Sequence, residues 1–304
     1  MNSVEQAITR EISKMVRYEG MVIRPPSEAD SLILQVTLGC SHNKCIFCGT
    51  YPDKKFRKRP LQEVFEAVES LQPYREEVRR VFLADGNALV LSTKDLEAIL
   101  DRLNGSFPNL NRVGTYANAN DILRKPVEDL RQLREKKLSI YYLGLESGSD
   151  TVLKLIKKGA TGADMVSCVK RAHEADVKMS VICILGIGGK KLSEEHARET
   201  AKVLNAMSPR FISFLTLMVV PGTPLEEMVA GGEFELLSPY EGLVELRRIV
   251  EKLDLSGSIL RTNHASNFLA LGGTLPKDKE NILREIDRCL HGEIALRPEF
   301  LRGL

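Results

Sequence analysis

The sequence contains no apolar run that approaches the roughly 20 residues needed to cross a bilayer, so we expect no membrane-spanning segment. Residues 1–19 lack the apolar core of a secretory signal and have the polar spacing of an amphipathic helix. The net charge of +2 argues against a general nucleic-acid-binding protein. Six cysteines, three of them clustered, do not have the pattern of a disulfide framework. These absences predict a cytoplasmic protein, in a reducing compartment and without a membrane partner.

The feature that stands out is the cluster of cysteines, because Cys40, Cys45 and Cys48 lie within nine residues. Thiolates are the usual ligands of iron–sulfur clusters, and a four-iron cube normally takes four of them. Three thiolates would leave one iron open, so that a small molecule could bind and react there. A structural zinc site completed by His42 is an alternative, and so is a redox pair formed by Cys45 and Cys48.

Strand and helix patterns alternate along the chain. Six short runs rich in Val, Ile, Leu and Tyr predict strands that are buried on both faces, at residues 32–38, 79–84, 111–116, 138–145, 177–185 and 210–217. Charged segments with helical periodicity lie between them, at residues 61–71, 93–103 and 127–136. Pro60 and Pro126 stand where helices begin, and Gly105 stands where a helix would stop. Residues 161–164 resemble a capping box.

This alternation predicts an α/β fold with a parallel sheet and right-handed crossovers. We expect a partial (β/α)6 barrel related to the TIM barrel, with an N-terminal helix and a small C-terminal α/β extension. The 304 residues would divide into a helical extension at 1–31, a barrel core at 32–224 and a C-terminal extension at 225–304. The last of these would cover the barrel and contribute to the substrate site.

Small and polar residues follow each predicted strand, and in such barrels the chemistry lies at the carboxyl ends of the strands. After the cysteine segment come Asp85, Gly86 and Asn87, then Tyr116 and Asn118, then Glu146 and Ser147, then Gly186 and Gly188, and finally residues 221–223. Taken singly, the glycines are typical of turns and Asp85 of an Asx turn. Glu146 ends an apolar run, where a carboxylate costs free energy unless it has a partner.

Residues 54–59 contain five basic side chains. Such a run is typical of a solvated loop. Because it closely follows the cysteines, it is also a candidate for holding an anionic substrate, a cofactor carboxylate or a phosphate. The other cysteines, Cys168, Cys183 and Cys289, are far apart in the sequence, and we expect them to be buried and inert.

These residues resemble the radical S-adenosylmethionine (SAM) superfamily, most closely the branch of oxygen-independent coproporphyrinogen oxidase and the methylthiotransferases. The family's first-strand loop carries Cys-x3-Cys-x2-Cys with an aromatic residue before the last cysteine, and Phe47 occupies that position. Residues 144–150 and 221–224 resemble its fourth- and sixth-strand signatures. One departure is that Cys40 and Cys45 enclose four residues instead of three.

The resemblance implies that Cys40, Cys45 and Cys48 ligate a [4Fe-4S] cluster whose fourth iron is chelated by SAM. It implies that Asp85 receives the methionyl ammonium, that Glu146 bonds the ribose hydroxyls and that Lys158 pairs with the methionyl carboxylate. The remaining cofactor contacts would come from Phe47, Gly86, Asn87, Tyr116, Asn118, Ser147, Gly186 and Gly188.

The activity implied is reductive cleavage of SAM to a 5′-deoxyadenosyl radical that abstracts hydrogen from a small-molecule substrate, in an oxygen-sensitive protein. A reductant such as flavodoxin or ferredoxin would supply the electron. RNA modification, with residues 54–59 as the contact, is an alternative, and a non-catalytic iron–sulfur electron-transfer protein is a less favoured one. No second cysteine cluster is present, so sulfur insertion is disfavoured, and we expect no cobalamin-binding domain.

The substrate should be encoded after residue 224, where the resemblance fades. Residues 261–267 are the densest polar group there, and they follow a short predicted strand at 256–260. They fit a surface turn, or a site in which His264 and Asn263 contact the substrate or cofactor. We expect His42 and His196 to be structural.

Overall fold

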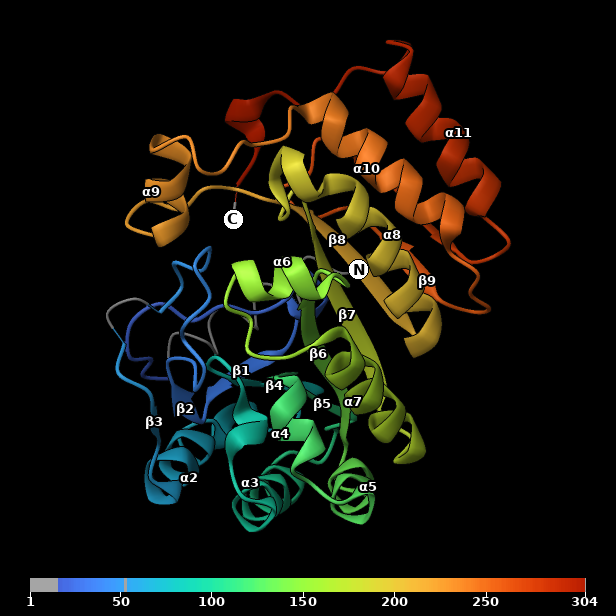
Figure 1. The fold of residues 1–304 in the computed structure, drawn as a ribbon. Helices are drawn as coiled ribbons and strands as arrows, with labels where there is room; N and C mark the ends of the chain where they lie inside the picture. The colour runs from blue at the N-terminus through green and yellow to red at the C-terminus, as the bar shows by residue number, and fades with distance from the viewer. Residues whose placement is uncertain (1–15, 52–53, 304) are drawn as a thin grey trace. The chain divides into compact units, whose positions relative to one another are not determined.

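The computed structural model describes residues 16–51 and 54–303, which form two compact units (Figure 1). The first contains the described residues of 1–43, 50–143 and 171–178. The second contains residues 44–49, 144–170 and those from 179 onward. The predicted helix at residues 1–19 lies mostly outside the described residues, and residues 16–25 contain no helix.

The sheet of the first unit is parallel. Its strands are β1 (Leu32–Gln35), β4 (Arg80–Ala84), β5 (Arg112–Ala117) and β6 (Leu138–Glu146), paired in that order. Two short strands, β2 (Thr37–Leu38) and β3 (Arg57–Lys58), form a separate antiparallel pair. The helices are α2 (Leu61–Glu69), α3 (Thr93–Ser106), α4 (Ala119–Leu123) and α5 (Val127–Glu135). Helix α3 lies between α2 and α5.

The second unit has parallel strands β7 (Lys178–Leu185), β8 (Phe211–Thr216) and β9 (Ile259–Arg261), and an antiparallel β10 (Gly272–Thr274). Its helices are α6 (Asp150–Leu155), α7 (Gly162–Glu174), α8 (Gly189–Met207), α9 (Pro224–Ala230), α10 (Pro239–Lys252) and α11 (Lys279–Leu290). In Figure 1, α10 lies between α8 and α11. Single turns of 3-10 helix occur at Pro26–Glu28, Gln72–Tyr74, Ala88–Val90 and Glu299–Leu301.

The three predicted helices and five of the six predicted strands are present, with ends that differ by a few residues, whereas the run at 32–38 is divided into β1, in the parallel sheet, and β2, in the antiparallel pair with β3. Alternate burial along β6 and β7 is nearly absent, because both faces of these strands are covered. The capping box is confirmed, since Thr161 and Asp164 exchange side-chain and backbone hydrogen bonds. The short strand predicted at 256–260 begins later, at Ile259.

The prediction that Gly105 ends a helix is wrong. Helix α3 continues to Ser106, and the Phe107 N–H still donates to the Leu103 carbonyl at 3.0 Å. Gly105 is exposed, whereas Ser106 and Phe107 are buried. A glycine costs about 1 kcal/mol in a helix, which is less than the gain from burying a phenylalanine.

No helix in the part of the chain that the structure describes is long and apolar enough to cross a membrane.

Candidate active site

The segment 44–49, which carries two of the clustered cysteines, is anchored in the core of the second unit. Ile46 is 3% exposed and packs in a cluster with Val152, Leu153, Ile156, Ile184, Ile187, Leu225 and Phe234. The Ile46 N–H donates to the Ile156 carbonyl at 3.2 Å, and the Leu225 N–H donates to the Ile46 carbonyl at 3.0 Å. One apolar residue between the cysteines therefore fixes the segment through its side chain and its backbone.

Cys45 and Cys48 lie at the two ends of one tight turn. The Cys48 N–H donates to the Cys45 carbonyl at 3.2 Å, and both side chains are partly exposed. Phe47 packs against the same core as the rest of the segment. A Cβ on Gly49 would lie 2.3 Å from Val220 Cγ1, so the backbone after Cys48 runs where only glycine fits.

Cys40 belongs to the first unit and is held from the end of β4. A Cβ on Gly86 would lie 2.5 Å from the Cys40 Cα, so this close approach requires glycine. The Asn87 Oδ1 accepts the Ser41 N–H at 3.3 Å and the Ser41 hydroxyl at 3.1 Å. Its amide donates to Asp121. Asn87 therefore holds the cysteine loop through Oδ1, and its amide nitrogen is itself held by Asp121; its contact with the cofactor stays a prediction.

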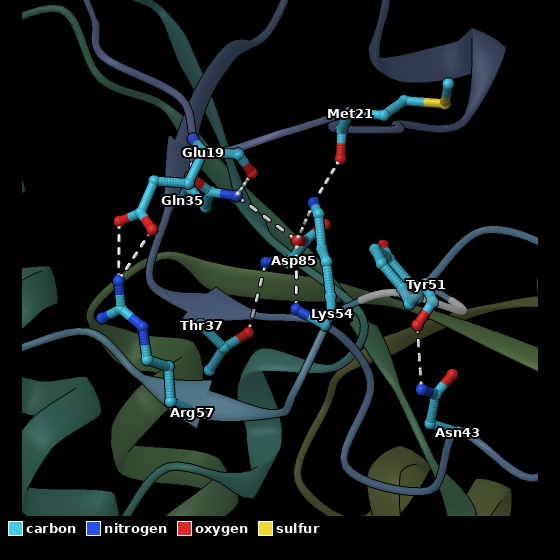
Figure 2. A network of polar contacts seen from close by, with 10 residues as sticks. Glu19, Met21, Gln35, Thr37, Asn43, Tyr51, Lys54, Arg57 and Asp85 are labelled. Atoms are coloured by element: carbon cyan, nitrogen blue, oxygen red, sulfur yellow. Dashed lines mark hydrogen bonds and ion pairs between the residues drawn. The ribbon is translucent and has the colours of Figure 1, made fainter.

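Asp85 is fully buried at the end of β4 and lies at the centre of a polar network (Figure 2). Its Oδ2 accepts from Lys54 Nζ at 3.0 Å, from the Gly39 N–H at 3.2 Å and from Gln35 Nε2 at 3.3 Å. Its N–H donates to Thr37 Oγ1 at 3.2 Å. Its Oδ1 is also buried and accepts no hydrogen bond from any described residue. The partners of the carboxylate are distant in sequence, so the Asx-turn interpretation is wrong.

Three of the basic residues at 54–59 are in ion pairs. The pairs are Lys54 with Asp85 at 3.0 Å, Arg57 with Glu19 at 2.7 Å and Arg59 with Glu63 at 3.1 Å. Lys55 and Lys58 are exposed. The run is therefore partly neutralised within the protein, and only part of it is a solvated loop.

Tyr116 lies in an aromatic group on one face of the first sheet. Its ring meets those of Phe82 and Tyr142 edge to face, with centroids 5.1 and 6.2 Å apart. Burial raises the pKa of the Tyr116 phenol, so it stays protonated and can donate a hydrogen bond. Asn118 begins α4, where its carbonyl accepts the Asp121 N–H at 3.1 Å.

In the second unit, the nearly buried carboxylate of Glu146 forms an ion pair. Lys158 Nζ donates to Glu146 Oε1 at 2.7 Å, and both side chains are nearly buried. A Cβ on Gly144 would lie 2.1 Å from that oxygen, so Gly144 makes the space for the pair. The structure thus brings together two residues that the sequence assigned to different parts of the cofactor.

Ser147 and Gly186 directly follow β6 and β7, and each contacts a buried titratable side chain. Ser147 Oγ lies 2.8 Å from His196 Nδ1, and His196 Nε2 lies 3.6 Å from Glu245 Oε1. Glu245 accepts the Gly186 N–H at 2.6 Å and the Ser193 hydroxyl at 2.5 Å. Burial raises the pKa of Glu245 to about 7 and lowers that of His196 to about 4.

The glycines after β7 have different backbone conformations. Gly186 has φ of 81° and Gly189 has φ of 59°, in the left-handed region that favours glycine. Gly188 precedes α8 with φ of −87°, and there a Cβ would meet Leu192 at 3.2 Å. The contact of Gly186 and Gly188 with adenine stays a prediction.

The residues 261–267 form a hydrogen-bonded loop after β9. His264 Nδ1 lies 2.9 Å from Ser266 Oγ and accepts the Ser266 N–H at 3.1 Å. Burial lowers the pKa of His264. Asn267 is buried and donates to the carbonyls of Phe214 and Thr262. Asn263 is exposed, and the roles proposed for it and for His264 stay predictions.

A pocket of about 410 Å3 lies within the second unit, next to this loop. Its lining is mainly aliphatic and comes from β7, β8, α10 and residues 267–269, with Gly186 on its wall. Arg302, 5% exposed, contributes a guanidinium that lies 4.0 Å from the centroid of the Phe268 ring. Neither Asn263 nor His264 lines the pocket. Its volume is in the range of small-molecule sites.

The sequence reasoning missed Glu245 and Lys54 as parts of these networks. Glu245 lies among the buried residues of α10, and a carboxylate between Leu243 and Leu246 was a signal that it needs partners. Lys54 was seen only as one charge in a basic run. Its pairing with Asp85 depends on a contact between residues 31 positions apart, which no local pattern shows.

The three cysteines suit an iron–sulfur cluster by their chemistry, although the described structure does not bring them together as a metal site. None of the six cysteines forms a disulfide, and Cys168, Cys183 and Cys289 are buried as expected. Within residues 16–51 and 54–303, no group of three His, Cys, Asp or Glu side chains lies close enough together to hold a metal ion. The clustered thiols are the soft ligands that iron–sulfur clusters take, and the buried Asp85 Oδ1 is an acceptor without a donor.

Comparison with known proteins gives the family. The model of the Radical SAM superfamily matches residues 34–204, more than half of the chain. An uncharacterized protein of Methanocaldococcus jannaschii is 26% identical over 214 residues, which cover 67% of this chain and 66% of that protein. The tRNA-2-methylthio-N(6)-dimethylallyladenosine synthase of Alkalilimnicola ehrlichii is 28% identical over 211 residues, which cover 66% of this chain and 46% of the synthase. The chain therefore spans about half to two thirds of the length of these relatives.

Among solved structures, coproporphyrinogen III oxidase of Escherichia coli matches with a TM-score of 0.55 and 15% identity, over 81% of this chain and 55% of the oxidase. This likeness shows the fold, the α/β partial barrel of radical SAM enzymes. The chain belongs to the Radical SAM superfamily, whose members use a [4Fe-4S] cluster and SAM. Membership favours the cluster over the zinc and redox interpretations of the three cysteines.

Proposed function

We propose that this chain is a radical SAM enzyme that acts on a small molecule, with its cluster held by Cys40, Cys45 and Cys48. The observation that carries the proposal is the donor set, three cysteines within nine residues of the sequence of a chain that belongs to this superfamily. When bound, the cluster and SAM supply the electron and the 5′-deoxyadenosyl radical of the family's chemistry. The protein's own residues bind and position these groups.

The first role of the protein is to hold the cysteines. Ile46 fixes the Cys45–Cys48 turn in a core, and Gly86 and Asn87 fix the backbone at Cys40 and Ser41. Each cysteine segment is therefore held in place by its own unit, and binding of the cluster would still have to bring the three thiols together, since the described residues form no metal site. Since each cysteine segment is fixed by contacts outside itself, the spacing of four residues instead of three between the first two cysteines is compatible with ligation.

The second role is to bind SAM through polar groups that can form further hydrogen bonds. Asp85 Oδ1 is an unpartnered buried acceptor, which we assign to the methionyl ammonium. Glu146, kept in place by Lys158, is assigned to the ribose hydroxyls. The backbone of Gly186, fixed by Glu245, is assigned to the adenine side of the cofactor.

A small substrate fits the chain better than RNA does. The pocket of about 410 Å3 has a mainly aliphatic lining, with Arg302 as a polar group. The basic run at 54–59, the expected RNA contact, has three of its five charges paired within the protein. RNA modification remains the second candidate because one relative is named as a tRNA-modifying synthase. We assign the reductant to the flavodoxin or ferredoxin class.

The test is anaerobic reconstitution of the wild type, of Cys45→Ala and of the control Cys168→Ala, which removes a buried thiol outside the cluster. After chemical reduction with SAM, the wild type and the control should show cluster absorbance and release 5′-deoxyadenosine. Cys45→Ala should lose both. Retention of both by Cys45→Ala would refute the ligand assignment.

Substrate class is tested with the same holoenzyme in cell extract. We expect coupled 5′-deoxyadenosine release with the low-molecular-mass fraction and none with purified RNA. Turnover with RNA alone, weakened by salt, would favour the second candidate. Failure to cleave SAM with any fraction or reductant would favour a non-catalytic electron carrier.

A further inference from the structure

The pocket of about 410 Å3 in the second unit has a wall made mainly of leucine side chains. They come from four segments: Leu185 ends β7, Leu217 follows β8, Leu243 and Leu246 belong to α10, and Leu269 lies in the loop after β9. Leu185, Leu243 and Leu246 are at most 4% exposed. Contact of such side chains with a ligand is favourable in proportion to the apolar area that leaves water.

The neutral polar side chains of the wall form hydrogen bonds within the protein. Thr216 Oγ1 donates to Asn267 Oδ1 at 2.8 Å, and the Asn267 amide donates to two backbone carbonyls at 2.7 and 2.9 Å. Thr262 Oγ1 donates to one carbonyl and accepts one N–H, both at 2.7 Å. Ser238 Oγ accepts the Glu241 N–H at 3.3 Å. A polar ligand would have to compete with these bonds, which reduces the net gain from a further hydrogen bond in this pocket.

The two charged residues of the wall, Glu299 and Arg302, neutralise each other. Arg302 Nη1 donates to the two carboxylate oxygens of Glu299 at 2.8 and 2.6 Å. Its Nε donates to the Ser266 carbonyl at 2.6 Å, and its Nη2 donates to the Leu217 carbonyl at 3.3 Å. An anion entering the pocket would meet a guanidinium that already has a carboxylate partner. It would therefore lose its hydration without gaining a free counter-charge.

The aromatic side chain of the wall, Phe268, is covered on one face. The Arg302 guanidinium carbon lies 4.0 Å from the centroid of the Phe268 ring, so that face cannot stack on a flat ligand. The rest of the apolar wall is aliphatic, and its contacts have no preferred direction. The pocket therefore suits a flexible aliphatic chain better than an aromatic ring or a charged group.

We propose that this pocket binds an uncharged aliphatic chain that forms the apolar part of the substrate. The inference rests on the proposed function and deepens it, because it names the chemical class of the substrate. Its basis is the combination of a leucine-rich wall, polar side chains that are bonded within the protein and a charged pair that is neutral as a whole. The volume of about 410 Å3 fits a small molecule.

The test is the binding of 1-alkanols, in a series from 1-butanol to 1-octanol, to the reconstituted holoprotein, measured by calorimetry. Each added methylene group that leaves water should lower the dissociation constant about fourfold. Octanoate has the same number of carbons and carries a charge. It should bind about tenfold more weakly than 1-octanol, because the guanidinium of Arg302 is already paired.

A substitution in the wall shows where the alkanols bind. Leu243→Phe places a larger side chain in the wall and should weaken 1-octanol binding about fourfold, the equivalent of one methylene group. Leu301→Phe is the matched control, since Leu301 is 59% exposed and does not line the pocket, and it should bind 1-octanol like the wild type. If Leu243→Phe does not fold, Leu269→Phe decides in its place, because Leu269 is only half-buried.

Three results would overturn the inference: a dissociation constant that does not change with chain length, tighter binding of octanoate than of 1-octanol, or wild-type affinity in a folded variant of the wall. The substrate role is tested by release of 5′-deoxyadenosine with low-molecular-mass metabolites, separated into an organic and an aqueous extract. Turnover with the organic extract would support that role, and turnover with the aqueous extract alone would contradict it. A holoprotein that binds the alkanols as expected but never cleaves SAM would refute the proposed function and the substrate role, while the alkanol series would still establish the binding site.

Discussion

The buried carboxylate of Glu245 should make the stability of the protein depend on pH, and the change to test is Glu245→Gln. Burial raises the pKa of this group from 4.5 to about 7, although the carboxylate accepts hydrogen bonds from Gly186 and Ser193. The folded state therefore holds its proton at pH values where the unfolded state has released it. The stabilisation is fully present below about pH 4.5 and is lost as the pH rises toward and above 7.

The magnitude follows from the shift of the pKa. About 1.4 kcal/mol for each pKa unit gives a loss of about 3 kcal/mol for the wild type between pH 4 and pH 8. Glu245→Gln cannot ionise and should not show this loss. His196, whose pKa is lowered by burial to about 4, makes the opposite contribution to the pH dependence of stability. This contribution is present in both proteins and largely cancels when they are compared.

The measurement is urea unfolding of cluster-free protein under reducing conditions at a series of pH values. We expect the free energy of unfolding of Glu245→Gln, relative to the wild type, to rise by about 3 kcal/mol from pH 4 to pH 8. The exposed Glu227→Gln should show no comparable rise. Parallel curves for wild type and Glu245→Gln would refute the claim that this carboxylate is buried with a raised pKa.

Three further substitutions test other parts of the site. Gly86→Ala should lower the iron bound after reconstitution by about tenfold, because the new Cβ would lie 2.5 Å from the Cys40 Cα; iron content equal to wild type would contradict this close approach. Lys158→Met should lower the free energy of unfolding by about 3 kcal/mol, since it leaves Glu146 buried and unpaired, and adding Glu146→Gln should recover most of the loss. No recovery in that double variant would show that the pair is not what stabilises this site. Ile46→Ala should cost about 2–5 kcal/mol in urea unfolding, as expected for a buried aliphatic side chain, and a smaller loss would mean that the cysteine segment is not anchored in the core.

The order of strands and helices could be predicted from the sequence because apolar runs and helical periodicity are local signals. Five of the six strands lie where the apolar runs place them, and the run at 32–38 is divided between β1 and β2 because its last residues pair with β3 instead of the main sheet. The cysteine spacing and the position of Glu146 at the end of β6 are also local signals. The partner that a buried Glu146 carboxylate requires is Lys158. Gly105 was misjudged because the burial of Ser106 and Phe107, which decides where α3 ends, is a tertiary effect.

The polar networks of the site could not be predicted in this way. The three donors to Asp85 Oδ2 come from Gln35, Gly39 and Lys54, which lie 31 to 50 positions away in the sequence. Asn87 was predicted only as a cofactor contact, which stays a prediction, and no local pattern indicated that it also holds Ser41 in the cysteine loop. Hydrogen bonds of this kind depend on which chain segments the fold brings together, and side-chain type alone does not specify them.

Mössbauer spectroscopy of the reconstituted protein, before and after addition of SAM, shows whether three cysteines hold a cluster that the cofactor completes. We expect a four-iron cluster in which one iron changes its spectrum when SAM binds, because three cysteines leave that iron for the cofactor. A spectrum that SAM leaves unchanged, or a protein that takes up zinc and no iron, would contradict it.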